Sequence, residues 1–370
     1  MSVDPGLASW LQLTLTPGIG GAALRTMLRQ FGLPENIVGQ SPSELSKFVA
    51  REALDGMASG QVQKAVASAL EWAARPRHSV ITLADPSYPR ALLEISDPPA
   101  VIYAIGRTEL LQRPALAIVG SRNATAQGEA NSESFAKALS EAGLTIVSGL
   151  AMGIDAAAHR GGLSAPGSTI AVLGTGVDIV YPRRNGELAA QIAEHGLLIS
   201  EFALGTAPAA HNFPKRNRLI SGLGRGCLVI EAAAASGSLI TARAAAEQGR
   251  DVFAIPGSIH SPLSRGCHAL IKTGAKLVES AQDVLDELSG FRGTAYATTT
   301  RTAGEEPAKE SDSGLLRCMG HDPVDVDALC NRAGLSVEQV SSELLRLELQ
   351  GLVAALPGGL YQRLEKGDRG

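Results

Sequence analysis

Short apolar runs alternate with segments of helical pattern through residues 80–289, and this alternation constrains the fold more than any other feature. The runs are Ala115–Val119, Leu144–Val147, Thr169–Leu173, Leu197–Ser200, Cys227–Ile230, Val252–Ile255 and Lys276–Val278. Helices are expected between them over 126–142, 153–162, 186–195, 214–224, 238–249, 264–273 and 281–288. Strands that are apolar throughout and separated by helices form a parallel sheet buried on both faces. The pattern predicts an α/β core with a doubly wound parallel sheet, and Val101–Ile105 is one more possible strand leading into it.

Changes in pattern divide the chain into four regions. Residues 1–78 have helical apolar spacing without a strand-like run, which predicts a small helical domain. Residues 79–289 form the predicted α/β domain, and the polar, unpatterned stretch 290–313 is expected to be a linker. Residues 314–370 are expected to form a separate compact unit, so the chain has three domains.

The last unit has the pattern of a winged helix. Helices are expected over 324–333 and 336–349, with Ser336 and Gln339 spaced as a capping box, and two strands over 351–363. The second helix carries three acidic residues and one basic residue, namely Glu338, Glu343, Glu348 and Arg346. The phosphates of DNA repel an acidic helix. We therefore expect this unit to contact another protein or to have a regulatory role, rather than to read DNA.

Composition excludes several classes of protein. The chain is 45% apolar and 19% charged, with a net charge of −4, so any nucleic-acid site must be a local basic patch. The four cysteines, Cys227, Cys267, Cys318 and Cys330, are far apart and fit free thiols better than a zinc site or disulfides. No apolar stretch approaches the ~20 residues of a membrane helix, and no secretory signal pattern is present. We expect a soluble, cytoplasmic protein with no membrane partner and without a bound metal or cofactor.

Glycine and serine dominate the ends of the predicted strands. In an open α/β sheet, ligands bind outside the carboxyl ends of the strands. The residues there that we assign to a binding pocket are Gly120, Ser121, Arg122, Ser148, Gly149, Gly237 and Ser238. Small residues let backbone N–H groups and hydroxyls approach an anion, and helix N-termini add partial positive charge. One such loop is ordinary in any α/β protein, but several loops together with an arginine favour a phosphate pocket.

A basic run over 211–218 is the second candidate feature. No acidic residue lies between Phe202 and Ile230, whereas this interval contains four cations, namely Lys215, Arg216, Arg218 and Arg225. Pro214 suits the first position of a helix, so the cations would lie near the positive end of the helix dipole. Repulsion between each cation and the dipole would cost roughly 0.3–1 kcal/mol of helix stability. A bound anion would offset this cost, and a solvated basic face is the alternative. The pocket is therefore expected to include Phe213, Lys215, Arg216, Asn217 and Arg218.

The segment 15–20 (Leu-Thr-Pro-Gly-Ile-Gly) between two predicted helices looks like a helix-hairpin-helix turn. The backbone amides of such a turn can meet a DNA phosphate without reading sequence. A tight turn between helices, without any ligand, is equally compatible with the pattern.

Catalytic motifs are sparse. The chain has no Gly-Lys dipeptide and hence no P-loop, and the third glycine of a dinucleotide fingerprint beginning at Gly174 would fall at Ile179. Asp155 and His159 lie four apart on one predicted helix face and could pair, with an orienting role favoured over acid–base chemistry. Glu231 at a strand end is the best candidate for a general base. We assign no catalytic residue and predict that the chain is not an enzyme.

The chain resembles the DNA-processing protein A family (DprA, also called Smf) over most of its length. The similarity is densest in A-I-V-G-S-R (117–122), I-V-S-G-L-A-M-G-I-D-A-A-A-H (146–159), F-P-K-R-N-R-L-I-S-G-L (213–223), E-A-A-A-A-S-G-S-L-I-T-A-R (231–243) and V-F-A-I-P-G (252–257). So many motifs in the same order are far more specific than a lone glycine pattern.

The resemblance implies an extended Rossmann-like core, flanked by an N-terminal helical (SAM or helix-hairpin-helix-like) domain and a C-terminal winged helix. It implies a homodimer that binds single-stranded DNA and loads the RecA recombinase onto incoming strands in natural transformation. It also implies that the pocket is built from the loop 120–122 and the run 215–218. No motif marks a dimer surface or a recombinase surface.

The residues also indicate how DNA would be held. Aromatic residues make up 4% of the chain, and within the basic run Phe213 alone is available for stacking. The grip is therefore expected to be mainly electrostatic, with little sequence preference. Two alternatives stay open. One is an enzyme on a related fold that cleaves the N-glycosidic bond of nucleotides through Glu231 and a nearby arginine, and the other is an interaction scaffold that binds no DNA.

Overall fold

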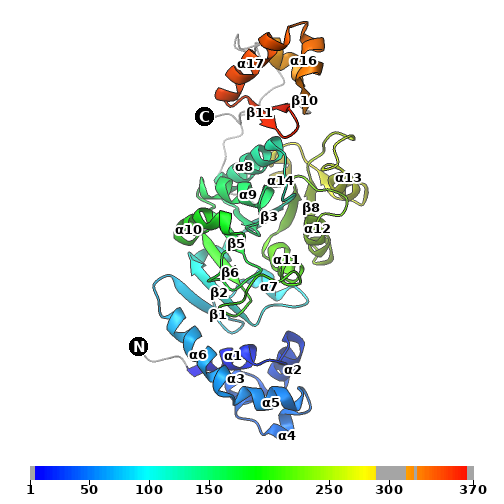
Figure 1. Ribbon diagram of the computed structural model, residues 1–370. Coiled ribbons are helices and arrows are strands. Elements are labelled where there is room, and N and C mark those ends of the chain that lie inside the picture. The colour runs from blue at the N-terminus through cyan, green and yellow to red at the C-terminus, as the bar shows by residue number, and fades with distance from the viewer. Residues whose placement is uncertain (1–4, 289–313, 321–322, 365–370) are drawn as a thin grey trace.

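The computed structural model describes residues 5–288, 314–320 and 323–364. Figure 1 shows a helical unit at one end, a sheet with its covering helices in the middle, and a small C-terminal unit at the other end. The predicted linker 290–313 lies outside the described residues.

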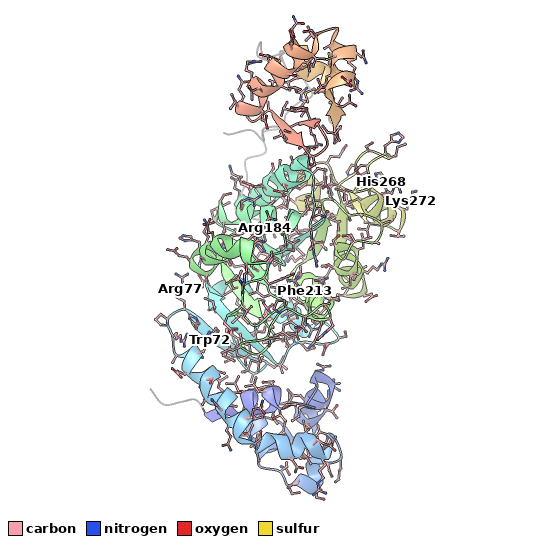
Figure 2. All side chains as sticks on the ribbon, in the orientation of Figure 1. Trp72, Arg77, Arg184, Phe213, His268 and Lys272 are labelled. Atoms are coloured by element: carbon pink, nitrogen blue, oxygen red, sulfur yellow. The ribbon has the colours of Figure 1, made fainter. Side chains whose placement is uncertain are left out.

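The described part of the N-terminal unit contains helices and no strand, as predicted. Its helices are α1 (Pro5–Leu15), α2 (Gly21–Phe31), α3 (Pro34–Val38), α4 (Pro42–Leu45), α5 (Arg51–Met57) and α6 (Gly60–Ala73). Leu13, Leu24 and Met27 pack in a core of its own. Trp10 and Trp72 instead pack against the sheet, and the Trp72 ring lies 5.9 Å from the ring of Tyr103 (Figure 2). The helical unit is thus joined to the sheet by buried aromatic contacts.

The middle unit contains a nine-stranded sheet of order β1-β2-β6-β5-β4-β3-β7-β8-β9. Its strands are β1 (His78–Thr82), β2 (Val101–Gly106), β3 (Ala115–Val119), β4 (Thr145–Ser148), β5 (Thr169–Val172), β6 (Leu197–Ser200), β7 (Gly226–Val229), β8 (Asp251–Ala254) and β9 (Lys276–Leu277). The seven strands from β6 to β9 in this order are mutually parallel. The predicted α/β class with a mostly parallel sheet is confirmed.

At one edge of the sheet, β2 runs opposite to all the other strands. β1 pairs antiparallel with β2, which in turn pairs antiparallel with β6. β1 was not predicted, because its five residues are half polar and only its last two are buried. A strand at the edge of a sheet needs no continuous apolar run, so its sequence gives little indication of a strand. The predicted domain boundary after residue 78 falls inside β1.

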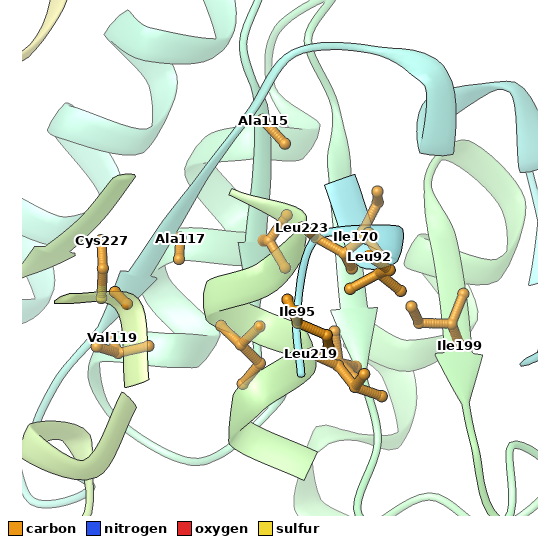
Figure 3. Close-up of a cluster of buried hydrophobic side chains, with 14 of the residues drawn as sticks. Leu92, Ile95, Ala115, Ala117, Val119, Ile170, Ile199, Leu219, Leu223 and Cys227 are labelled. Carbon is orange, nitrogen blue, oxygen red and sulfur yellow. The ribbon is translucent and has the colours of Figure 1, made fainter. Parts of the chain in front are cut away.

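Helices cover both faces of the sheet. α7 (Arg90–Leu93), α11 (Asn212–Leu223), α12 (Ser238–Glu247) and α13 (Arg265–Lys272) lie on one face. α8 (Ala126–Glu141), α9 (Ile154–Leu163) and α14 (Ala281–Glu287) lie on the other, and α10 (Gly186–His195) packs near β6. Because side chains alternate along a strand, β3 sends Ala117 and Val119 to the α11 side, where Leu219 and Leu223 are buried (Figure 3).

The described residues of the C-terminal unit form three helices and a three-stranded sheet. Its elements are α15 (Gly314–Met319), β10 (Val324–Asp325), α16 (Val326–Ala333), α17 (Val337–Leu349), β11 (Val353–Leu356) and β12 (Leu360–Arg363). The predicted capping box of Ser336 and Gln339 is present at the start of α17. α15 was not predicted, and β10 takes the first two residues of the helix predicted over 324–333.

Candidate nucleic-acid interface

The first cavity, of about 720 Å³, opens at the carboxyl ends of β3 and β7. The chain winds from β3 towards β6 in one direction and from β7 towards β9 in the other, so the strand order reverses here. Ligands of doubly wound sheets bind at such a switch point. Eight of the twelve residues predicted to bind DNA line the cavity, namely Gly120, Ser121, Arg122, Phe213, Arg216, Asn217, Gly237 and Ser238. The first residues of α11 and α12, among them Phe213 and Ser238, line this cavity, so the positive ends of both helix dipoles lie beside it.

The loop after β3 holds Arg122 at the mouth of the cavity. Gly120 lets the strand pass close to α9, because a Cβ there would lie 2.6 Å from the Ile154 side chain. The Ser121 N–H donates to the Glu231 carbonyl oxygen at 2.7 Å, which ties the loop to β7. Arg122 is exposed, and its guanidinium carbon lies 6.0 Å from the centre of the Phe213 ring. Within the described ranges Arg122 forms no salt bridge, so its charge is available to an anion.

Arg216 forms the floor of the first cavity and is buried. Its guanidinium donates to the carbonyl oxygens of Gly149, at 2.8 Å, and Val172. A Cβ on Gly149 would lie 2.7 Å from that guanidinium, so a larger residue here would have to displace the Arg216 side chain. On the other side, the Asp155 carboxylate accepts from the Gly149 and Ala151 N–H groups at 3.1 and 3.3 Å. Burial lowers the pKa of Arg216 to about 10, and the negative charge of Asp155 partly offsets this effect. Arg216 therefore remains a cation near neutral pH.

Ser148 and Gly149 lie beneath the cavity rather than in its lining. Ser148 is fully buried, and its hydroxyl donates to the Ile118 carbonyl oxygen at 2.6 Å. Gly149 acts through the Arg216 guanidinium that it accommodates. These two predicted site residues therefore support the pocket from below.

Asp155 and His159 each bind the loop 149–151, and neither is a hydrogen-bond partner of the other. His159 Nε2 accepts from the Leu150 N–H at 3.2 Å, so this nitrogen carries no proton. Nδ1 donates to the Thr169 hydroxyl oxygen at 2.7 Å, because that hydroxyl already donates to the Ile146 carbonyl oxygen. Full burial lowers the pKa of His159 to about 3, and the charge of Arg216 adds to this effect. The histidine is a neutral structural group.

We predict that acid destabilises the fold through His159. Its pKa is about 3 in the folded chain and near the ordinary 6.5 when unfolded. Between these values the unfolded chain binds a proton that the folded chain does not, so stability falls as the pH is lowered, by about 1.4 kcal/mol per unit. In urea unfolding, His159→Gln should lose less stability between pH 7 and pH 5 than the wild type loses. Equal losses would mean that His159 does not cause the decline.

Lys215 and Arg218 line a second cavity, of about 430 Å³, on the other side of α11. The Arg218 guanidinium binds both oxygens of Glu201, at 2.8 and 3.0 Å, and lies 3.3 Å from Asp97. Lys215 Nζ is 3.6 Å from Glu201 and 5.3 Å from the centre of the Phe202 ring. Residues three apart on a helix share a face, so the basic run is divided between two cavities.

The basic run is balanced by acidic side chains from outside the interval. α11 begins at Asn212, which places Pro214 at the third helical position and not at the first as predicted. Proline fits there because N–H groups in the first turn have no partner within the helix. Arg218 and Lys215 are compensated by Glu201, and Arg216 by Asp155. A bound anion is therefore not needed to explain these three cations, whereas Arg122 has no such partner among the described residues.

Glu231 anchors α8 and is not among the residues lining the first cavity. Its two carboxylate oxygens accept from the Thr125 N–H at 2.9 Å and the Thr125 hydroxyl at 2.6 Å. Thr125 in turn caps α8 by accepting from the Gly128 N–H. Burial raises the pKa of Glu231, while the bonds from Thr125 lower it. The candidate for a general base thus has a structural role.

Tyr181 is a residue of the first cavity that was not predicted. It is 47% exposed, and its ring centre lies 5.5 Å from that of Phe213, which is labelled in Figure 2. The loop that carries it starts at the end of β5, where Gly174 had drawn attention, but the tyrosine comes seven residues later. Two aromatic rings therefore stand at the cavity, where one was expected.

Two negative findings concern the described residues alone. None of their helices combines the length and the apolar character needed to cross a bilayer. In the same ranges, no group of three or more His, Cys, Asp or Glu side chains is arranged to hold a metal ion. The four cysteines are free thiols, as expected.

Two family models match the chain. DNA recombination-mediator protein A matches residues 79–289, and the DprA winged helix domain matches residues 299–359. Protein Smf of Escherichia coli is 43% identical over 308 residues, covering 82% of each chain. DNA processing protein DprA of Streptococcus pneumoniae is 51% identical over 206 residues, which are 56% of this chain and 73% of that one.

Two solved structures are similar as well. The X-ray structure of DprA from Streptococcus pneumoniae superposes with a TM-score of 0.66 at 38% identity, covering 78% of this chain and 99% of that chain. DNA processing protein A from Helicobacter pylori, described for its single-stranded DNA binding mode, has a TM-score of 0.52 at 31% identity. The superposition covers 56% of this chain and 95% of the Helicobacter pylori chain.

Proposed function

The chain belongs to the DNA recombination-mediator protein A (DprA/Smf) family, and from this membership we propose that it binds single-stranded DNA in the first cavity. The family is one of recombination mediators and not of enzymes. The Helicobacter pylori relative, with its single-stranded DNA binding mode, supports the choice of ligand.

The observation that carries the proposal is the exposed Arg122, which has no acidic partner among the described residues, beside the rings of Phe213 and Tyr181. An arginine without an acidic partner can bind a backbone phosphate, and the helix N-termini at the cavity add positive potential. Aromatic rings take stacked bases only where the bases are unpaired. Phosphate and base contacts together favour a single strand over a duplex, with little sequence preference.

Fluorescence anisotropy with an oligo-dT and a duplex of equal length, over a series of salt concentrations, tests this proposal. We expect tighter binding of the single strand and an affinity that falls steeply with salt, because cations at phosphates release counterions. Equal or tighter binding of the duplex would contradict it. The nucleotide-cleaving alternative finds no support at the cavity, since Glu231 is engaged with Thr125.

We infer further that the protein loads a RecA recombinase onto incoming strands in natural transformation, acting as a cytoplasmic homodimer. The support is the family resemblance of the motifs in the core. The protein should accelerate formation of RecA filaments on DNA coated with single-stranded DNA-binding protein, and light scattering should give twice the mass of the chain. Absence of acceleration at saturating protein would exclude the loading role, and a monomer mass would exclude the dimer.

A further inference from the structure

Two exposed arginines lie beside the first cavity without belonging to its lining. Arg183 and Arg184 follow Tyr181 on the loop between β5 and α10, where they begin the short 3-10 helix η2 (Arg183–Asn185). Neither forms a salt bridge with a residue that the structure describes. Arg184 Nη1 donates to the Met152 sulfur at 3.1 Å, a contact that leaves its charge uncompensated (Figure 2). Both cations are therefore available to an anion, as Arg122 is.

The loop after β4 joins the loop of Arg122 to the loop of these two arginines. β3, β4 and β5 are neighbours in the sheet, so the three loops leave it side by side. Gly153 lies against the backbone of Arg122, since a Cβ there would be 2.8 Å from the Arg122 carbonyl oxygen. The Asn185 amide donates to the Leu150 and Ala151 carbonyl oxygens at 2.9 and 3.2 Å. The three loops thus form one continuous rim, held together by short contacts.

The cations of this rim are spaced for successive phosphates of one strand. Neighbouring strands of a sheet lie 4.7–4.9 Å apart, so the ends of β3 and β5 are separated by about 10 Å. A stacked strand advances about 3.4 Å per nucleotide, so three nucleotides, or fewer in a stretched strand, cover that distance. Tyr181, which lines the first cavity, comes from the same loop as Arg184. A base stacked on its ring therefore brings the strand to the two arginines.

The second cavity offers the strand no comparable path. Its cations already have acidic partners, because Arg25 binds Asp97 at 2.5 Å and both Arg218 and Lys215 lie against Glu201. A phosphate there would meet two carboxylates. The predicted helix-hairpin-helix turn forms part of the wall of this cavity. Uncompensated positive charge thus favours the rim at β3, β4 and β5 over the side of α11 that faces the N-terminal unit.

We propose that the bound strand runs from the first cavity along this rim, where Arg183 and Arg184 bind the phosphates that follow the one held at Arg122. This inference rests on the proposed binding of single-stranded DNA in the first cavity. Arginine binds phosphate oxygens through two parallel N–H groups, so each arginine takes one phosphate. The binding site is therefore longer than the cavity, and its outer part depends on salt and not on base sequence.

The double variant Arg183→Ala with Arg184→Ala tests this path, by fluorescence anisotropy with an oligo-dT that extends beyond the first cavity. We expect roughly tenfold weaker binding at low salt, and no loss of melting temperature because both side chains are exposed. Two lost phosphate contacts flatten the slope of log K against log salt by about 1.4. The advantage of the wild type should therefore shrink roughly sevenfold between about 50 and 200 mM salt.

The length of the oligonucleotide separates the rim from the cavity. The double variant should bind the shortest oligo-dT that still binds the wild type equally well, and the two affinities should diverge as the strand is lengthened. Arg243→Ala is the matched control. This arginine is exposed on α12, one turn beyond the cavity residue Ile240, and forms no salt bridge with a described residue. Its replacement should change neither the affinity nor the slope.

The outcomes separate this inference from the proposed function. Unchanged affinity and slope in the double variant would overturn the path along the rim. An equal or larger loss in Arg243→Ala would also overturn it, because the strand would then lie over α12 or respond to positive charge in general. If Arg122→Ala still weakens binding in either case, the first cavity remains the DNA site. If Arg122→Ala also has no effect, the proposed site fails as a whole.

Discussion

Replacing Arg122 by alanine is expected to weaken binding of single-stranded DNA by roughly tenfold to a hundredfold. Hydrogen bonds between charged groups contribute about 1.5–3 kcal/mol, and Arg122 is the exposed cation of the first cavity that has no acidic partner among the described residues. The other arginine in the lining, Arg216, is buried and already donates to two carbonyl oxygens. The loss should be similar for every base sequence, because the contact is to the backbone.

The salt dependence identifies the contact as one to phosphate. Each phosphate neutralised on a single strand contributes about −0.7 to the slope of log K against log salt, so Arg122→Ala should flatten that slope by about this amount. Arg122→Lys should retain much of the slope while losing two-pronged binding. Arg29→Ala, an exposed cation on α2 outside both cavities, is the control. Wild-type affinity in Arg122→Ala would exclude this arginine from the interface.

Replacing the buried Arg216 by methionine is expected to lower the free energy of unfolding by roughly 3–5 kcal/mol. The change leaves the Gly149 and Val172 carbonyl oxygens without their donor. It also removes the positive charge that compensates the buried Asp155 carboxylate, whose pKa burial already raises. Urea unfolding monitored by circular dichroism measures the effect.

A second substitution distinguishes the two causes. In the double variant Arg216→Met with Asp155→Asn, the uncompensated charge is gone and part of the lost stability should return. The amide oxygen of the introduced asparagine can still accept from one of the N–H groups of the loop 149–151. A double variant less stable than Arg216→Met alone would contradict this. It would show that the hydrogen bonds accepted by the Asp155 carboxylate stabilise the fold by more than its uncompensated buried charge destabilises it.

Much of the central sheet could be predicted from the sequence because its parallel strands are buried on both faces. Such strands read as continuous apolar runs, and β3 and β6 match their predicted bounds. β1 could not be found in this way. It lies at the antiparallel edge, where half of its residues remain accessible and the apolar run is broken.

The parts of the candidate site that lie at strand ends could be predicted from the sequence. The parts that depend on ion pairs between residues far apart in the sequence could not. Glycine, serine and Arg122 at the end of β3 follow from the topology of an α/β sheet. Arg218 lines the second cavity and binds Glu201, whereas Arg216 lines the first. Glu201 lies just before the interval from Phe202 to Ile230 that contains no acidic residue. Local sequence shows four cations there, and only the fold shows which of them already have partners.

Aromatic residues show the same limit. Tyr181 comes from a loop whose path has no local pattern, and its place beside Phe213 depends on the whole fold.

Ultraviolet crosslinking of a bound oligo-dT, followed by mass spectrometry of the crosslinked peptides, tests the central claim most directly. Thymine stacked at the first cavity should crosslink to peptides that contain Phe213 or Tyr181, and at subsaturating DNA Arg122→Ala should strongly reduce these crosslinks. Crosslinks confined to the C-terminal unit, or unchanged by Arg122→Ala, would contradict single-strand binding at the switch point of the sheet.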